Sequence, residues 1–265
     1  MMAAIPPSQR RVAICADDFG LGDAADRAIL ELGASNAITA TSVAVDGPVV
    51  DRDAAALREL RGQLSIGLHL NLTDNPYPKG PVDVRGWITA TWLRRIDTRV
   101  MERELRRQFD RFEQLFGTPP THVDGHEHVH QFPGLREALL ETMASRCAPT
   151  TPIRCTWPRH FRGMKAAAIG LLGAKALRHE AGKMNRRCNS DFAGVYDLRT
   201  ASGFGKRMDE WLRSIHDGGL VMCHPETAGP RSSAARVHEY EFLRSPAWPA
   251  LRRSWNIRLV RPDAG

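Results

Sequence analysis

The stretch that decides the fold is Val12-Ala13-Ile14-Cys15-Ala16-Asp17-Asp18-Phe19-Gly20. Its apolar, β-forming residues end in two adjacent carboxylates and a glycine, which predicts a buried strand that delivers Asp17 and Asp18 at its carboxyl end. Folds of the α/β class keep their chemistry at such strand ends. At a bend between strand and loop both side chains can reach one cavity, where one carboxylate binds a metal and the other moves protons. For an isolated Asp-Asp pair, a turn or a helix cap is the alternative explanation.

Strand-like and helix-like segments alternate along the rest of the chain. Further strands are expected at 38–45, 65–73, 121–130, 153–157, 191–197 and 219–226. Helices are expected at 23–33, with Asp23 as its cap, and at 51–61, 98–116, 135–146, 163–179 and 204–216, and a long loop at 74–97. The 265 residues, 42% of them hydrophobic, suit one large core. The pattern predicts an α/β fold in a single domain over residues 1–265, a TIM-like and distorted (β/α) barrel, with residues 1–10 flexible.

Charge and cysteine content restrict the partners and the compartment. The chain has 37 basic and 30 acidic residues, a net charge of +7, which favours acidic partners. Basic residues are interspersed with acids, as in 102–107, so we expect an ordinary solvated surface and no nucleic-acid partner. Five cysteines without CxxC spacing indicate a reducing cytoplasm.

Membrane insertion is not indicated by the sequence. The N-terminus lacks a hydrophobic signal core, and the longest apolar run, 166–174, is too short to span a bilayer. We therefore expect no transmembrane segment. Because Lys165 and Lys175 flank this run, peripheral contact with a membrane surface stays open beside burial of a core-facing helix.

Two histidines are expected near strand ends. In 65–73, Ile66, Leu68 and their partners alternate with a polar face that carries His69 and Asn71. His224 follows the apolar run 219–223, repeating the pattern of the first strand. Either histidine can be a hydrogen-bonded core residue or a functional group.

The densest group of candidate ligands lies in 121–130. If this segment is a strand, one face carries His122, Asp124, His126, His128 and His130. That face is roughly 26 Å long at about 3.3 Å per residue, so its members cannot all bind one ion. One or two would be ligands, and the others would support them or contact the substrate.

The same segment matches the zinc-peptidase pattern HExxH at His126-Glu127-x-x-His130. That chemistry needs both histidines one helical turn apart on a helix. Gly125 before the motif and Pro133 after it favour strand and loop instead.

Four motifs together resemble the YdjC-like carbohydrate deacetylases, which include chitooligosaccharide deacetylases and hopanoid-biosynthesis-associated members. The motifs lie at 16–20, 67–72, 121–130 and 222–225, in the order and spacing of that family. The resemblance implies a distorted (β/α) barrel that removes acetyl groups from N-acetylated sugars with a divalent metal. Family members often have histidine or glutamine where this chain has Glu127, and residues 155–188 match no motif of the family.

The resemblance also implies roles for particular residues. Asp18, His69 and His126 would bind the metal, Asp17 would act as general base, and His224 would act as general acid or transition-state contact. Apart from the resemblance, Asn71, Asp124, His128 and His130 are expected to contact the substrate, because they share the polar faces of 65–73 and 121–130. Zn²⁺ suits the two imidazoles and one carboxylate, with Mg²⁺, Mn²⁺ or Co²⁺ as alternatives. A homodimer follows by analogy with the family.

The sequence therefore predicts a hydrolase in which metal-activated water attacks the amide of an N-acetylated carbohydrate. Two alternatives stay open: a zinc peptidase acting through the HExxH match, and a carbohydrate-binding barrel without turnover.

Overall fold

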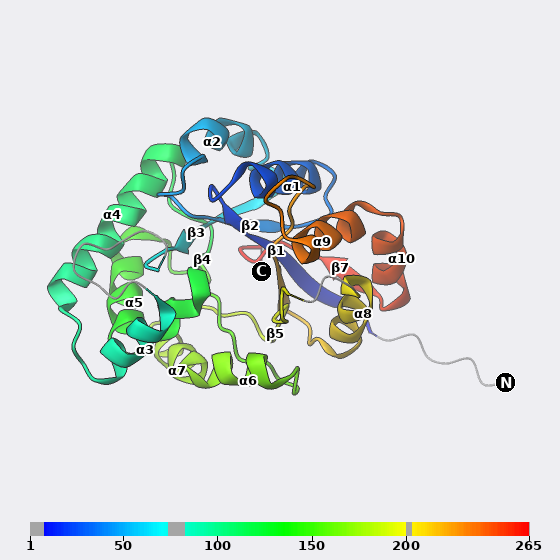
Figure 1. Ribbon diagram of the computed structural model, residues 1–265. Helices are drawn as coiled ribbons and strands as arrows, with labels where there is room; N and C mark the ends of the chain where they lie inside the picture. The colour runs from blue at the N-terminus through cyan, green and yellow to red at the C-terminus, as the bar shows by residue number, and fades with distance from the viewer. Residues whose placement is uncertain (1–7, 74–82, 200–202, 265) are drawn as a thin grey trace.

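The computed structural model describes residues 8–73, 83–199 and 203–264. Its centre is a parallel sheet built around strand β1 (Arg10–Phe19) (Figure 1). The sheet has the order β4-β3-β2-β1-β6-β5, and β7 pairs with the beginning of β1. The other strands are β2 (Ala40–Val43), β3 (Ser65–Leu70), β4 (Val123–Gly125), β5 (Phe192–Ala193), β6 (Gly219–Cys223) and β7 (Ile257–Leu259).

Two single-residue bridges continue the sheet beyond β4. Val123 pairs in parallel with Ile153, and Ile153 pairs with Cys188, which leads into β5. The sheet therefore curls round toward its own other edge, and the prediction of a distorted α/β barrel is confirmed. In the segment 153–157, where a strand was expected, only Ile153 pairs with the sheet, through single-residue bridges.

Side chains of β1 alternate between two apolar layers. Val12, Ile14 and Ala16 pack in the large core that includes the helices, whereas Ala13 and Cys15 belong to a smaller cluster with residues of β5 and β6. Successive side chains of a strand point to opposite faces. Asp17 therefore continues the row of Ala13 and Cys15 into the barrel interior.

Helices surround this sheet (Figure 1). They are α1 (Asp23–Ala34), α2 (Val50–Glu59), α3 (Val84–Trp92), α4 (Thr98–Phe116), α5 (Leu135–Arg146), α6 (Met164–Leu171), α7 (Ala174–Lys183), α8 (Phe204–Ser214), α9 (Ala234–Arg244) and α10 (Ala247–Ser254). The bounds predicted for α4 are confirmed: Asp97 caps its start, and Gly117 ends it with φ 70°. Along the described residues, no helix combines the length and apolarity needed to cross a bilayer.

Four local expectations are corrected. The strand expected at 121–130 ends at Gly125, and a 3₁₀ helix, η1 (His126–Gln131), follows. The loop expected at 74–97 contains α3, while 74–82 lie outside the described residues. The helix expected at 163–179 divides into α6 and α7 around Gly173. Of the expected flexible residues 1–10, 1–7 lie outside the described residues and β1 already begins at Arg10.

The cap predicted for α1 is also wrong. Gly22 occupies the cap position, and Asp23 is the first helical residue. Asp26, one turn in, accepts a hydrogen bond from the backbone N–H of Gly20 at 2.6 Å.

Candidate metal centre and active site

A β-bulge near the end of β1 turns both carboxylates toward the same region. The pairing register with β2 shifts between Ala16 and Phe19, and Asp18 takes a left-handed φ of 73°. Such a conformation is unfavourable for a residue other than glycine and is typical of functional sites. Asp17 and Asp18 are each only 1% exposed.

Three ligand atoms converge at this end of the barrel. The distance is 3.2 Å from Asp18 Oδ1 to His126 Nδ1, 3.3 Å from His126 Nδ1 to His69 Nε2, and 3.4 Å from His69 Nε2 to Asp18 Oδ1. Ligands held tetrahedrally about 2.0–2.1 Å from a zinc ion lie roughly 3.3–3.4 Å from one another. The triangle of Asp18, His69 and His126 thus suits one small divalent ion.

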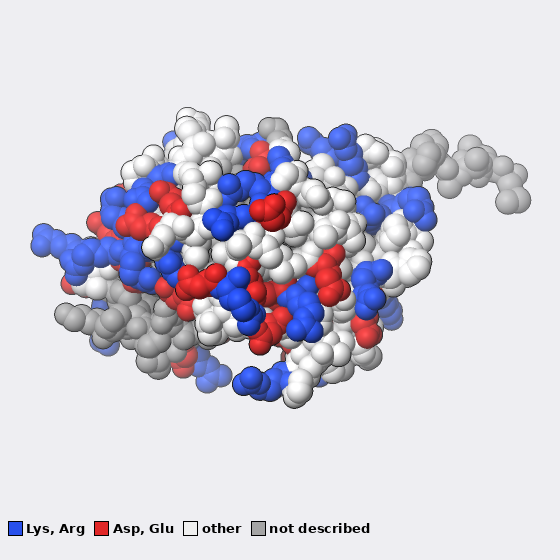
Figure 2. Space-filling model, turned by 90° about the horizontal axis from the view of Figure 1, so that it is seen from above, with Lys and Arg blue, Asp and Glu red and all other residues white. Residues whose placement is uncertain are grey.

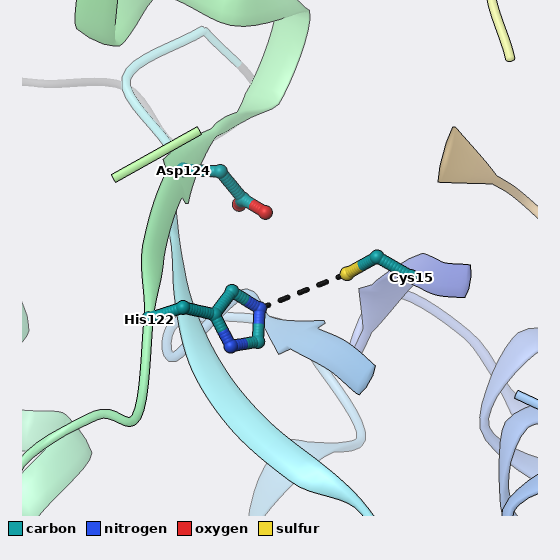
Figure 3. A group of neighbouring side chains, drawn as sticks. All are labelled: Cys15, His122 and Asp124. Carbon is teal, nitrogen blue, oxygen red and sulfur yellow. Dashed lines mark hydrogen bonds between the residues drawn. The ribbon is translucent and has the colours of Figure 1, made fainter. Parts of the chain in front are cut away.

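Two other groups in the described residues bring three possible ligands together. One is Cys15, His122 and Asp124, whose side chains point toward one another in Figure 3, and the other is Asp17, His69 and Asp124. Both contain Asp124, which is ion-paired with the Arg154 guanidinium at 2.6 Å. A fixed cation inside each group opposes a metal ion there. In the first group the contact is between Cys15 Sγ and His122 Nε2, 3.7 Å apart, and burial raises the pKa of the Cys15 thiol and lowers that of His122.

Arg154 is the main residue that the sequence pattern did not reveal. It donates from Nη1 to Asp17 Oδ2 at 2.5 Å and from Nη2 to Asp17 Oδ1 at 2.6 Å, and it is 3% exposed. Ser42 Oγ also donates to Asp17 Oδ1, at 3.1 Å. The available signal was an arginine inside a segment expected to be a buried strand, because a buried arginine needs a carboxylate partner.

Asp124 orients the His69 ring through the ring nitrogen that faces away from the triangle. Its Oδ1 lies 2.6 Å from His69 Nδ1, and its side chain has no exposed area. The carboxylate holds the proton on Nδ1 and fixes the ring orientation, so that Nε2 is the nitrogen that faces Asp18 and His126. Burial alone would lower the pKa of His69, but Asp124 and then Asp18 outweigh it and raise that pKa to about 10. A substrate contact at Asp124, expected from the polar face of 121–130, would compete with its contacts to His69 and Arg154.

Asp124→Asn is expected to weaken metal binding about 10–100-fold, because asparagine cannot fix the same tautomer and orientation of His69. Titration of the metal-free protein with Zn²⁺ measures this. Asp191→Asn is the matched control, since Asp191 is equally buried and ion-paired with Arg162 at 2.8 Å. Equal metal affinity in the two variants would contradict the role of Asp124.

The second oxygen of Asp18 meets another arginine that the sequence pattern did not reveal. Arg236 Nη2 lies 3.0 Å from Asp18 Oδ2, and its Nη1 lies 3.1 Å from Glu226 Oε1. Burial would raise the pKa of Asp18, but contacts with His126 and His69 hold it well below its usual range. Asp18 is therefore a carboxylate with Oδ1 directed at the two histidines and Oδ2 neutralised by Arg236.

His224 follows β6 and lies near the two carboxylates. Its backbone N–H donates to Glu239 Oε2 at 2.5 Å, and Glu239 Oε1 accepts from the Tyr196 hydroxyl at 2.6 Å. Its ring Nδ1 is buried without a hydrogen-bond partner in the described part of the chain. Burial lowers the pKa of His224 to about 4, despite Asp18 and Asp17, so the resting imidazole is neutral.

The remaining expected substrate contacts are buried. Asn71 accepts from the Thr73 N–H at 3.1 Å and is 5% exposed. His128 is 8% exposed and packs edge-on against the Phe192 ring, with centroids 5.8 Å apart. His130 has no exposed area, and its Nε2 lies 2.9 Å from the Arg154 carbonyl oxygen.

The segment that matches HExxH does not form an α-helix. Within η1, Glu127 and His128 have φ of 48° and 60°, which are not helical values. His126 belongs to the triangle, whereas His130 contacts the Arg154 backbone. The two histidines therefore do not converge as ligands in the way that the peptidase pattern requires.

A cavity of about 770 Å³ opens beside Arg236. Its walls come from the segments after β1 and β6, among them 21–25, Arg27, 226–232 and Arg236. Arg236 links the cavity to the triangle, because it lines the cavity and pairs with Asp18. Grooves at the carboxyl ends of barrel strands are where such folds bind small molecules.

The model of the YdjC-like protein family matches residues 11–254, which include the triangle, Arg154 and His224. The chain belongs to the YdjC-like family. This membership covers almost the whole barrel, so the resemblance found in the sequence motifs is confirmed.

The chain is also similar to curated proteins and, in its fold, to solved structures. A chitooligosaccharide deacetylase of Salmonella typhimurium is 33% identical over 145 residues, which cover 52% of this chain and 57% of the relative. The match therefore spans little more than half of that protein. A solved Enterococcus faecalis V583 protein, described as a candidate cellobiose-phosphate cleavage protein, superimposes with a TM-score of 0.71 at 21% identity, covering 97% of this chain and 99% of that one.

A more distant neighbour shares the fold alone. It is a solved peptidoglycan N-acetylglucosamine deacetylase, with a TM-score of 0.52 and 11% identity. The superposition covers 97% of this chain and 87% of the neighbour.

Proposed function

We propose that this YdjC-like protein is a metal-dependent hydrolase that removes the acetyl group from an N-acetylated sugar or glycoconjugate. The observation that carries the proposal is the triangle of Asp18, His69 and His126 beside the buried carboxylate of Asp17. The name of the Salmonella relative supports chitooligosaccharides as the first substrates to test. The cavity beside Arg236 would hold the sugar.

Asp18, His69 and His126 would hold the divalent ion, with Zn²⁺ favoured and Mg²⁺, Mn²⁺ or Co²⁺ as alternatives. When bound, the ion supplies a Lewis acid that polarises the amide carbonyl and makes water more acidic. The separations of 3.2–3.4 Å among the three ligand atoms would suit Zn²⁺, and two of the three ligands are the imidazoles that it prefers.

Asp17 would accept the proton of the attacking water. Arg154 and Ser42 hold its carboxylate in one orientation, and Oδ2 keeps an unused lone pair beside its contact with Arg154. His224 would pass a proton to the departing amine nitrogen. Burial lowers the pKa of His224 to about 4, so the resting ring carries no extra proton. The proton that Asp17 takes from water would therefore have to reach His224 before the amine leaves.

Acetate release from a panel of substrates tests the reaction. Metal-loaded protein should release acetate from N-acetylglucosamine oligomers and not from N-acetylated peptides. Peptide cleavage would favour the zinc-peptidase alternative. Binding of the sugars without release would favour the barrel without turnover.

His224→Ala is expected to slow amide hydrolysis on the order of 10²-fold, because the amine leaving group needs a proton. An activated acetyl ester has a better leaving group and should lose much less rate. Initial rates on both substrates with one variant give the comparison. Equal losses on amide and ester would argue that His224 does not act as the acid.

Compartment and assembly are part of the same proposal. We place the enzyme in the cytoplasm, because all five cysteines are free thiols in the structure. A homodimer rests on family analogy and is tested by the molecular mass in solution.

A further inference from the structure

The excess positive charge of the chain is confined to residues 159–187. This segment has eight basic residues and one acid, a net charge of +7, which equals the net charge of the whole chain. Its charged residues are Arg159, Arg162, Lys165, Lys175, Arg178, Lys183, Arg186 and Arg187, against Glu180. By contrast, acidic and basic groups are interspersed on the face that Figure 2 shows. The evenly mixed surface expected from the sequence therefore does not describe this segment.

Large apolar side chains project from the same segment. Phe161, Met164 and Leu171 are 74%, 78% and 73% exposed, more than any other large hydrophobic residue among those described. Met164 and Leu171 are two helical turns apart and share one face of α6. The opposite face of α6 is buried through Ala166 and Gly170. Helix α6 thus packs on the barrel through small residues and presents its large ones outward.

A cationic hollow is lined mainly by residues that flank α6 in the sequence. It has a volume of about 500 Å³ and is lined by Trp157, Arg159, Lys175, Arg178 and His216. Lys175 Nζ lies 4.1 Å from the centre of the Trp157 ring. Arg159 and Arg178 donate to backbone carbonyls of 189–190. In the part of the chain that the structure describes, no acidic side chain forms an ion pair with Arg159, Lys175 or Arg178. Their charge is thus available to an anionic group.

We propose that this region docks on an anionic lipid bilayer. The region, called here the α6 surface, consists of Phe161, Met164 and Leu171 together with Arg159, Lys165, Lys175 and Arg178. The apolar side chains would enter the headgroup–acyl boundary, and the hollow would receive lipid phosphate groups. In Figure 1 the surface lies at the lower edge of the molecule, along α6 and α7.

The combination of features selects a bilayer over other anionic partners. A nucleic acid would be attracted by the charge but gives exposed Phe, Met and Leu side chains little to bury against. Neither charge nor apolar contact alone anchors a protein firmly, whereas the two together do. The inference does not depend on the deacetylase proposal, because lipid binding is measured without substrate.

Sedimentation of the full chain with vesicles tests the proposal. The protein should bind vesicles that contain phosphatidylglycerol and not pure phosphatidylcholine vesicles. Lys165→Glu/Lys175→Glu should weaken binding by at least about 30-fold, since each basic residue near an anionic surface contributes about fivefold. Phe161→Ser/Met164→Ser/Leu171→Ser should weaken it on the order of tenfold or more.

The control variant reverses two positive charges on a different surface of the protein. Arg103→Glu/Arg106→Glu reverses two exposed charges on α4 and should leave vesicle binding unchanged. Equal loss in this control would show general electrostatic attraction and overturn the proposal. So would undiminished binding of the triple apolar variant, or tight binding of a short oligonucleotide that depends on Lys165 and Lys175 alone. Thermal unfolding of each variant shows that it is folded.

Discussion

Asp17→Asn is expected to lower the turnover of an N-acetylated sugar on the order of 10²-fold or more. Asparagine has nearly the volume of aspartate but cannot accept a proton from water. Arg154 would keep its ion pair with Asp124, so the barrel interior should stay assembled. Steady-state rates at saturating metal, together with the metal content of the variant, measure the effect.

Glu127→Gln is the matched comparison for this prediction. Glu127 lies in η1 outside the triangle, with a left-handed φ of 48°, so removing its charge should reduce activity only modestly. The peptidase alternative predicts the opposite order, because HExxH chemistry uses its glutamate as general base. A larger loss in Glu127→Gln than in Asp17→Asn would therefore overturn the assignment of the base.

The site residues that sequence pattern can predict share one property. Asp17, Asp18 and His69 each stand at or near the end of a strand whose apolar pattern is visible locally, whereas His126 was assigned through the motifs that resemble the family. Because the carboxyl ends of parallel strands meet at one edge, the pattern alone predicts that strand-end residues distant in sequence lie close together.

Arg154 and Arg236 could not be found in this way. Their partners, Asp17 and Asp18, lie 137 and 218 positions away, and no local periodicity marks such a pair. Only the closure of the barrel brings Arg154 beneath Asp17. A buried cation between two acids follows from the tertiary fold, and not from strand or helix preference.

The segment after Gly125 shows a different limit. Alternating histidines imitate the period of a strand, yet the chain turns at Glu127 and His128 with left-handed φ values. The alternate spacing of these histidines therefore does not indicate an extended backbone. It arises because a candidate ligand, His126, and the buried His128 and His130 occupy alternate positions of a turning chain. Likewise, prolines and glycines near residue 80 obscured α3, although Asp83 caps it by accepting from the Gly86 N–H at 2.7 Å.

Alanine at Asp18, His69 or His126 is expected to reduce metal binding more strongly than Asp124→Asn does. Removing a ligand deletes one of three bonds to the ion, whereas removing its hydrogen-bond partner only weakens one, by about 10–100-fold. Each variant should also lose nearly all acetate release while its thermal unfolding stays cooperative. Metal analysis after dialysis against a known concentration of free Zn²⁺ gives the occupancy.

His130→Ala separates ligand loss from general damage to this region. His130 is buried two residues after His128 and contacts the Arg154 carbonyl, but it lies outside the triangle. The His130→Ala variant should bind metal normally. Its stability can fall, because the His130 side chain that packs against Gly125 is removed. If His130→Ala lost the ion and His69→Ala kept it, the ligands would have to be sought along the HExxH segment. Full occupancy in all three alanine variants would show instead that the ion binds elsewhere, because no site keeps its affinity after losing any one of three ligands.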